Sequence, residues 1–124
     1  MDMNANYILL YVDSPASSRD FYESLLGQKP VEDSATFVLF VLPSGVKFGL
    51  WGKNGVVPAA STPGGSEIGF PVDTADAVDR IAGEWKERGL RIIQQPEDVD
   101  FGRTFTALDP DGHRLRVLCL DMAQ

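Results

Sequence analysis

Hydrophobic and polar positions follow two periodicities along the chain, and together they predict the same order of elements twice. Short apolar runs rich in β-branched and aromatic residues are typical of strands, and apolar residues three or four positions apart are typical of helices. The first half predicts strands near 7–12, 29–32, 36–42 and 46–51, and a helix over 16–26. The second half predicts strands near 67–72, 90–93, 104–108 and 115–120, and a helix over 75–88.

Turn-forming residues separate these elements and reinforce the repeat. Capping side chains precede both helices, and Gly27 and Gly89 follow them as residues that tolerate the backbone of a helix end. Further turns or loops are predicted at 43–45, 97–102 and 109–112. The two halves repeat at a spacing of about 60 residues, and each half leaves an incomplete sheet that needs its twin.

The repeat predicts an α+β fold in a single domain over residues 1–124. Two βαβββ modules, about 5–55 and about 66–121, are joined by a linker of turn-forming residues at about 52–66. We expect the two half-sheets to form a cup-shaped mixed sheet with the helices outside.

Composition and charge narrow the function classes. The net charge of −7 and pI near 4.5 exclude the basic surface needed for nucleic acid or an anionic membrane. No uncharged apolar run approaches the roughly 20 residues of a membrane span, and the first residues carry no export signal. The one cysteine, Cys119, lies in an apolar run and predicts a small buried side chain and no internal disulfide. These features predict a cytoplasmic protein.

Several motifs resemble one known family over nearly the whole chain. The matching segments are Tyr11-Val12-Asp13, Ser18-Arg19-Asp20-Phe21-Tyr22 and Leu26-Gly27 in the first half, and Ile68-Gly69-Phe70-Pro71-Val72-Asp73 and Asp109-Pro110-Asp111-Gly112-His113 in the second. They resemble the vicinal oxygen chelate superfamily of glyoxalases, bleomycin resistance proteins and extradiol dioxygenases. Further segments are similar to its phenazine-antibiotic resistance branch, which binds its drug without transforming it: 48–51, 64–67 and 101–105. The resemblance also implies a homodimer.

Enzymes of this superfamily carry one metal ligand on each of four strands facing the cup. Counted from the motifs, those positions are here Tyr7, Gly49, Glu67 and Arg116. Only Glu67 is an ordinary metal ligand, and the permanent charge of Arg116 repels a cation. We therefore expect no metal and no other cofactor. Glu67 and Arg116 are instead predicted to form an ion pair inside the cup, either to satisfy each other or to recognise a ligand.

Strand alternation predicts which side chains face a ligand. Tyr7 and Tyr11 share one face of the first strand, and Gly49 and Trp51 share one face of the fourth. The missing side chain of Gly49 predicts a gap beside Trp51 into which a flat ring fits, although a large aromatic residue at that position is also commonly core.

The resemblance also implies a lid over the cup, formed by the segment around Gly102. Phe101 and Phe105 are predicted to sandwich a planar guest, and Arg103 either contacts a carboxylate of that guest or is a solvated surface residue. Trp85 is assigned to the core because it lies on the apolar face of its helix. His113 follows the 109–112 turn and is assigned to that turn, so no catalytic residue is predicted.

Three hypotheses follow from these residues. The leading one is metal-independent binding and sequestration of a planar hydrophobic small molecule, plausibly a phenazine-type antibiotic, by a protein that is not an enzyme. The second is a lyase, isomerase or transferase of the same fold, which requires a metal or a further base. The third is an interaction module whose cup is filled by its own side chains.

Overall fold

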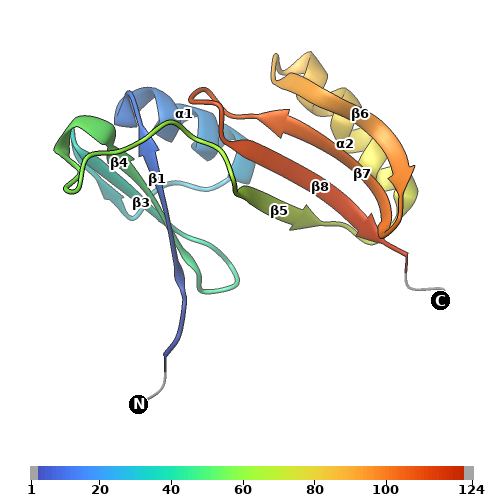
Figure 1. The fold of residues 1–124 in the computed structure, drawn as a ribbon, viewed down its shortest axis with the longest axis horizontal. Helices are drawn as coiled ribbons and strands as arrows, with labels where there is room; N and C mark the ends of the chain where they lie inside the picture. The colour runs from blue at the N-terminus through green and yellow to red at the C-terminus, as the bar shows by residue number, and fades with distance from the viewer. Residues whose placement is uncertain (1–2, 122–124) are drawn as a thin grey trace. The chain divides into compact units, whose positions relative to one another are not determined.

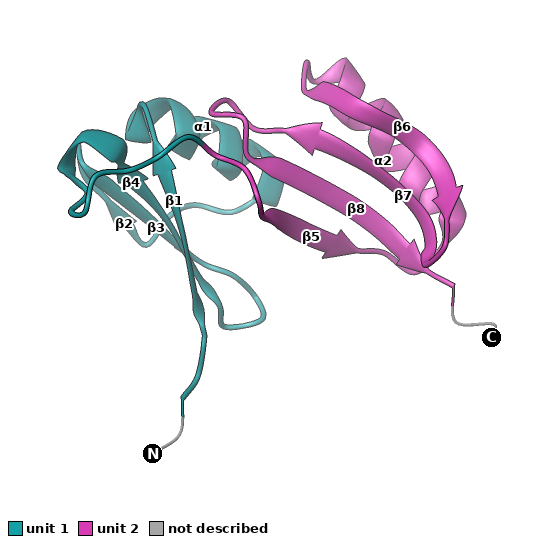
Figure 2. Ribbon diagram, in the orientation of Figure 1, with its two compact units in different colours: residues 1–62 teal, residues 63–124 magenta. Residues whose placement is uncertain are grey.

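The computed structural model describes residues 3–121, and the chain divides into two compact units (Figures 1 and 2). Unit 1 comprises Met1–Thr62 and unit 2 comprises Pro63–Gln124. Each unit contains one helix packed on one four-stranded mixed sheet, which confirms the α+β fold and the repeated order of elements. Neither helix within residues 3–121 is long and apolar enough to cross a membrane.

Unit 1 has the strand order β1-β4-β3-β2, in which β1 and β4 are parallel and the other pairs are antiparallel. Its elements are β1 (Tyr7–Val12), α1 (Pro15–Leu26), β2 (Glu32–Asp33), β3 (Phe37–Val41), β4 (Lys47–Gly52) and the short 3-10 helix η1 (Lys53–Gly55). The second strand is shorter and later than the predicted 29–32, and η1 opens the segment predicted as a linker.

The ends of α1 are fixed by local chemistry. The Ser14 hydroxyl accepts a hydrogen bond from the Ser17 backbone N–H at 3.2 Å, and Pro15 occupies the first turn, where no backbone donor is required. Gly27 ends the helix with a φ of 67°, and its N–H donates to the Glu23 carbonyl at 3.0 Å. The predicted glycine stop is thus confirmed.

The core of unit 1 lies between α1 and one face of the sheet. Tyr22 of α1 is fully buried, and its ring packs edge-on against Phe48 of β4, with ring centroids 4.8 Å apart. The strand residues on this face alternate with residues on the other face, as a pleated strand requires. The strand residues that face α1 are all buried: Val12, Val38, Phe40, Phe48 and Leu50.

Unit 2 repeats this plan with the strand order β5-β8-β7-β6, again with one parallel pair, β5 with β8. Its elements are β5 (Glu67–Pro71), α2 (Ala75–Glu87), β6 (Arg91–Val99), β7 (Gly102–Leu108) and β8 (Arg114–Leu120). The Thr74 hydroxyl caps α2 by accepting from the Ala77 N–H at 3.1 Å. The aspartate-rich turn before β8 is held by the buried Asp109, whose carboxylate accepts from the backbone N–H of Asp111 and His113.

The core of unit 2 is built around Trp85, as predicted. This side chain is buried and meets Phe105 and Phe70 edge-on, with ring centroids 5.3 Å and 6.0 Å away. Leu115 and Val117 of β8 complete the buried face beneath α2. The aromatic cluster therefore fixes which face of this sheet is interior.

The loop predicted at 97–102 is shorter than expected, because β6 continues to Val99 and β7 begins at Gly102, which leaves a turn at residues 100–101. Pro96 lies within β6, although a proline cannot donate a ladder hydrogen bond. The strand β6 is the edge strand of its sheet and pairs with β7 through register shifts between Ile92 and Glu97. An edge strand with bulges tolerates a proline that cannot donate a ladder hydrogen bond.

Gly102 is required where β7 begins. Its φ is 139°, and a Cβ there would overlap the Cys119 carbonyl oxygen and lie 2.9 Å from the Asp121 backbone nitrogen. Gly112 also has a positive φ, 90°, but a Cβ there would meet open space. A side chain at Gly112 would therefore meet backbone strain alone, whereas one at Gly102 would meet both backbone strain and steric overlap.

We expect Gly102→Ala to destabilise the protein more than Gly112→Ala. Gly112→Ala should cost about 1–2 kcal/mol through backbone strain alone. Gly102→Ala should cost roughly 2 kcal/mol more, because β8 must move to accept the methyl group. Urea unfolding of both variants measures the difference, and equal losses would contradict the overlap argument.

Candidate functional site

The sheet face of unit 1 that does not contact α1 carries several large apolar side chains. On β1, Tyr7, Leu9 and Tyr11 are 55%, 42% and 40% exposed, while the alternate residue Val12 is buried. On β4, Gly49 and Trp51 share this face because they pair in register with Leu9 and Tyr11. We call this surface the open face of unit 1. Exposed apolar side chains gathered on one surface are typical of a binding site.

A pocket of about 390 Å³ lies on this open face. Its lining is Tyr7, Leu9, Phe37 and Trp51, from three adjacent strands. Trp51 is half-buried, and its ring stands nearly perpendicular to the rings of Tyr11 and Phe37, at centroid distances of 6.3 Å and 6.4 Å. These edge contacts hold the indole in place and leave the pocket walled mainly by aromatic and aliphatic surface. Its volume falls within the roughly 300–1,000 Å³ of small-molecule sites.

Gly49 has a different role from the predicted one. The expected gap beside Trp51 is filled, because a Cβ on Gly49 would lie 2.7 Å from Leu9 Cδ2 and 2.9 Å from Phe37 Cζ. The absent side chain lets these two residues pack over the backbone of β4. A ring therefore does not slide against Gly49 itself, and Leu9 and Phe37 form the base on which it would lie.

The corresponding open face of unit 2 is polar and internally bonded. Arg116 Nε donates to Glu67 Oε1 at 2.6 Å, which is the predicted ion pair. Arg116 Nη1 donates to Gln94 Oε1 at 3.1 Å and to Thr104 Oγ1 at 3.2 Å, and the Thr106 hydroxyl donates to the same Gln94 oxygen at 2.7 Å. The Arg116 side chain is only 19% exposed. The network thus satisfies a half-buried guanidinium from three neighbouring strands.

The residues at the four metal-ligand positions of the resemblance do not fit a metal. Tyr7 and Gly49 offer no carboxylate or imidazole, and the Glu67 carboxylate already accepts a hydrogen bond from the permanently charged Arg116. Within residues 3–121, no group of three or more His, Cys, Asp or Glu side chains is placed to hold a metal ion.

The predicted lid from Phe101 to Phe105 is wrong for most of its length. Residues from Gly102 onward belong to β7, and Phe105 is fully buried against Trp85 on the helix side of the sheet. Arg103 and Phe105 are two positions apart on β7, so their side chains lie on the same side of the sheet. Phe101 lies in the turn before β7 and is 39% exposed, so its contact with a ligand stays a prediction.

Arg103 is engaged within its own unit. Its Nε donates to Asp79 of α2 at 2.8 Å and its Nη1 to Asp98 of β6 at 3.0 Å. The hydrogen bonds to Asp79 and then Asp98 raise the pKa of the Arg103 guanidinium above its ordinary value. The side chain clamps α2 to the edge of the sheet, an arrangement that neither of the two predicted roles included.

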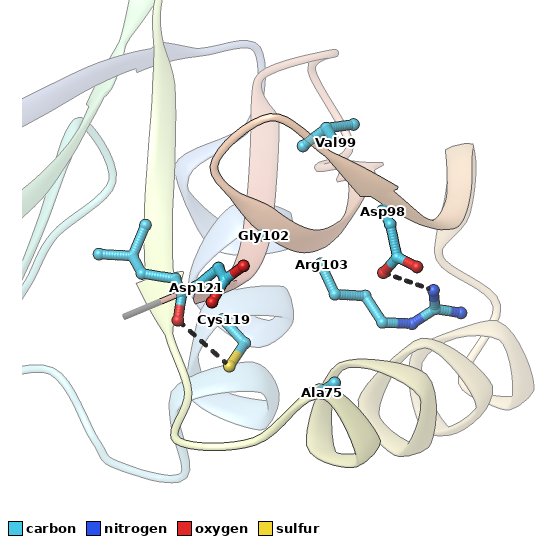
Figure 3. A pocket seen from close by; sticks show the side chains of 8 residues that line it. Ala75, Asp98, Val99, Gly102, Arg103, Cys119 and Asp121 are labelled. Carbon is cyan, nitrogen blue, oxygen red and sulfur yellow. Dashed lines mark hydrogen bonds and ion pairs between the residues drawn. The ribbon is translucent and has the colours of Figure 1, made fainter. Parts of the chain in front are cut away.

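A second cavity, of about 720 Å³, lies at the end of the sheet beside the first turn of α2 (Figure 3). Arg103 and Asp98 meet at its wall, and Cys119 lines it as a half-buried free cysteine, which is less buried than predicted. The cation of this wall is already bound by two carboxylates. The cavity therefore offers a ligand less unsatisfied surface than the open face of unit 1.

Sequence reasoning missed several contributors to the two open faces, among them Phe37, Gln94 and Thr104. Phe37 belongs to β3, and extending the alternation from β4 through the hairpin would have placed it opposite Trp51. Gln94 and Thr104 carried no signal of their own, because uncharged polar residues on strands are common on any solvated face.

Comparison with known proteins places the chain in context. The family model of the Glyoxalase/Bleomycin resistance protein/Dioxygenase superfamily matches residues 4–117. The phenazine antibiotic resistance protein EhpR of Enterobacter agglomerans is 37% identical over 119 residues, covering 94% of this chain and 92% of that protein.

Solved structures agree with that match. The solution NMR structure of protein ATC0852 from Agrobacterium tumefaciens is 48% identical, with a TM-score of 0.90 over 97% of this chain and 99% of the other. A glyoxalase-related enzyme from Fulvimarina pelagi is 20% identical, with a TM-score of 0.82 over 94% of this chain and 87% of the other, a likeness of fold alone.

We expect Arg116→Met to lower the free energy of unfolding by about 1–2 kcal/mol, because hydrogen bonds to a charged donor are lost from a half-buried network. The control is Arg80→Met. Arg80 lies 3.9 Å from Glu84 in an exposed pair, whose loss should cost less than about 0.5 kcal/mol. Urea unfolding measures both, and similar values for the two variants would show that the network contributes no more than a surface pair.

Proposed function

The chain belongs to the Glyoxalase/Bleomycin resistance protein/Dioxygenase superfamily, and on that premise we propose that it binds and sequesters a planar aromatic small molecule. The superfamily, by its name, includes both enzymes and resistance proteins, so membership alone does not choose between catalysis and binding. The ligand class we propose is a phenazine-type antibiotic. Sequestration would protect a cell by lowering the free concentration of the compound.

One observation carries the proposal: an apolar, aromatic-lined pocket lies open on the sheet face of unit 1. Tyr7, Phe37 and Trp51 contribute three rings to it, and Leu9 supplies an aliphatic base. Aromatic walls suit a flat ring system, since offset or edge-on ring contacts add about 0.5–1.5 kcal/mol each beyond burial. The relative EhpR is named as a phenazine antibiotic resistance protein, which is consistent with such a guest.

The same pocket argues against chemistry at this site. The four lining side chains include no carboxylate, imidazole, thiol or amine, and their one ionisable group is the phenol of Tyr7. The phenol of Tyr7 can orient a guest by hydrogen bonding. Binding without transformation is the function that such a lining supports best.

We expect Trp51→Leu to weaken the binding of phenazine-1-carboxylic acid at least roughly tenfold, because one aromatic wall is lost. Isothermal titration calorimetry measures the dissociation constant. Phe21→Leu is the matched control, since Phe21 lies on α1, on the other side of the same sheet, with its ring 5.0 Å from Tyr22. It should change the constant less than twofold. Equal effects of the two substitutions would place the site elsewhere.

Sequestration further predicts one-to-one binding and an unchanged ligand. After prolonged incubation with purified protein, chromatography with mass spectrometry should recover the phenazine compound without a new product. A time-dependent product that scales with protein concentration would favour the enzyme hypothesis, and elemental analysis of protein prepared without chelator would then show whether a metal takes part.

A further inference from the structure

Lys47 stands at the edge of the open face of unit 1. It is the first residue of β4 and pairs in register with Tyr7, so alternation places it on the same face as Gly49 and Trp51. Its Nζ lies 5.3 Å from the centroid of the Tyr7 ring, and that ring lines the pocket. A positive charge is therefore held beside an otherwise apolar site.

The other cations of the unit are paired with carboxylates. Arg19 lies 3.0 Å from Asp20, Lys29 lies 4.0 Å from Glu23, and Lys53 lies 3.2 Å from Asp13.

Lys47 differs from them among the described residues. No carboxylate lies within 4.0 Å of its ammonium, although the residue is half-buried. A ring face satisfies such a charge only in part, since a cation–π contact contributes about 0.5–1 kcal/mol at exposed sites. In a protein with a net charge of −7, this ammonium is therefore available to pair with an anion from outside the chain.

We propose that Lys47 makes this pocket selective for planar aromatic compounds that carry a carboxylate. The proposal rests on the proposed function and adds the ligand's charge to it. The ring system occupies the space between Tyr7, Phe37 and Trp51, and the carboxylate lies at the rim, where it accepts a hydrogen bond from the Lys47 ammonium. Arg103, for which contact with such a carboxylate was one of two predicted roles, is bound to Asp79 and Asp98.

The test compares phenazine-1-carboxylate with phenazine-1-carboxamide, which has nearly the same shape and no charge. Calorimetry at pH 7.5 should give the unmodified protein a roughly five- to tenfold preference for the carboxylate, as expected of a charge-assisted hydrogen bond in a partly solvated site. Raising the salt concentration from 50 to 500 mM should reduce that preference, because salt screens the exposed charge.

Variants identify the residue responsible. Lys47→Met replaces the charged side chain with an unbranched, uncharged one that is one atom shorter, and it should abolish the preference, whereas Lys47→Arg should retain it. Lys29→Met is the control for net charge, because the Lys29 side chain is 87% exposed and this substitution also removes one positive charge. The preference of this variant for the carboxylate over the carboxamide should stay within twofold of that of the unmodified protein. Thermal melts confirm that each variant is folded.

The outcomes separate the two proposals. If the carboxamide binds the unmodified protein as tightly as the carboxylate, or if Lys47→Met and Lys29→Met lower the preference equally, the role of Lys47 is overturned while sequestration of planar aromatics stands. If neither compound binds, the proposed function fails and the selectivity proposal fails with it.

Discussion

Each sheet is covered by a helix on one face only, and this constraint decides the role of nearly every strand residue. Alternation sends half of each strand into the core beneath the helix and the other half onto the open face. In unit 1 the buried half includes Phe40, Phe48 and Leu50. The uncovered half is free to differ without disturbing the core, so a single fold can carry different open faces in its two units.

The two open faces differ in what fills the position at their centre: apolar packing in unit 1 and hydrogen bonds in unit 2. The register equates Gly49, paired with Leu9, and Arg116, paired with Gly69, since each lies on the strand parallel to the first strand of its unit. At this position unit 1 has no side chain, and apolar neighbours pack over the backbone. Unit 2 has a guanidinium bonded to three partners. One position of the repeat thus supports an apolar pocket in one unit and a closed polar network in the other.

The sequence was sufficient to predict the order of elements, both helix ends and the Glu67–Arg116 pair. Periodicity and capping residues act locally, and the pair was predicted from two metal-ligand positions of the resemblance that carry opposite charges. Prediction from the sequence failed where the outcome depends on neighbours. Phe105 was predicted to contact a ligand because the resemblance implied a lid around Gly102, but Phe105 pairs with Val117 across β7 and β8 and shares its buried side of the sheet. The filled space above Gly49 was missed as well, because it depends on Phe37, a residue of the neighbouring strand β3 that pairs opposite Trp51. The relation of the units as a cup and the homodimer stay predictions.

Charge explains why the open face of unit 1 suits an incoming molecule better than that of unit 2. An anion that approached Arg116 would compete with Glu67, Gln94 and Thr104 and would leave a carboxylate without its partner. Breaking one side of a partly buried ion pair is unfavourable, because the remaining charge loses its compensation. Lys47, by contrast, has no carboxylate within 4.0 Å among the described residues, so an incoming carboxylate would break no ion pair there. A ligand gains most where the protein has left its own charge unsatisfied, and in unit 1 that place adjoins the aromatic pocket.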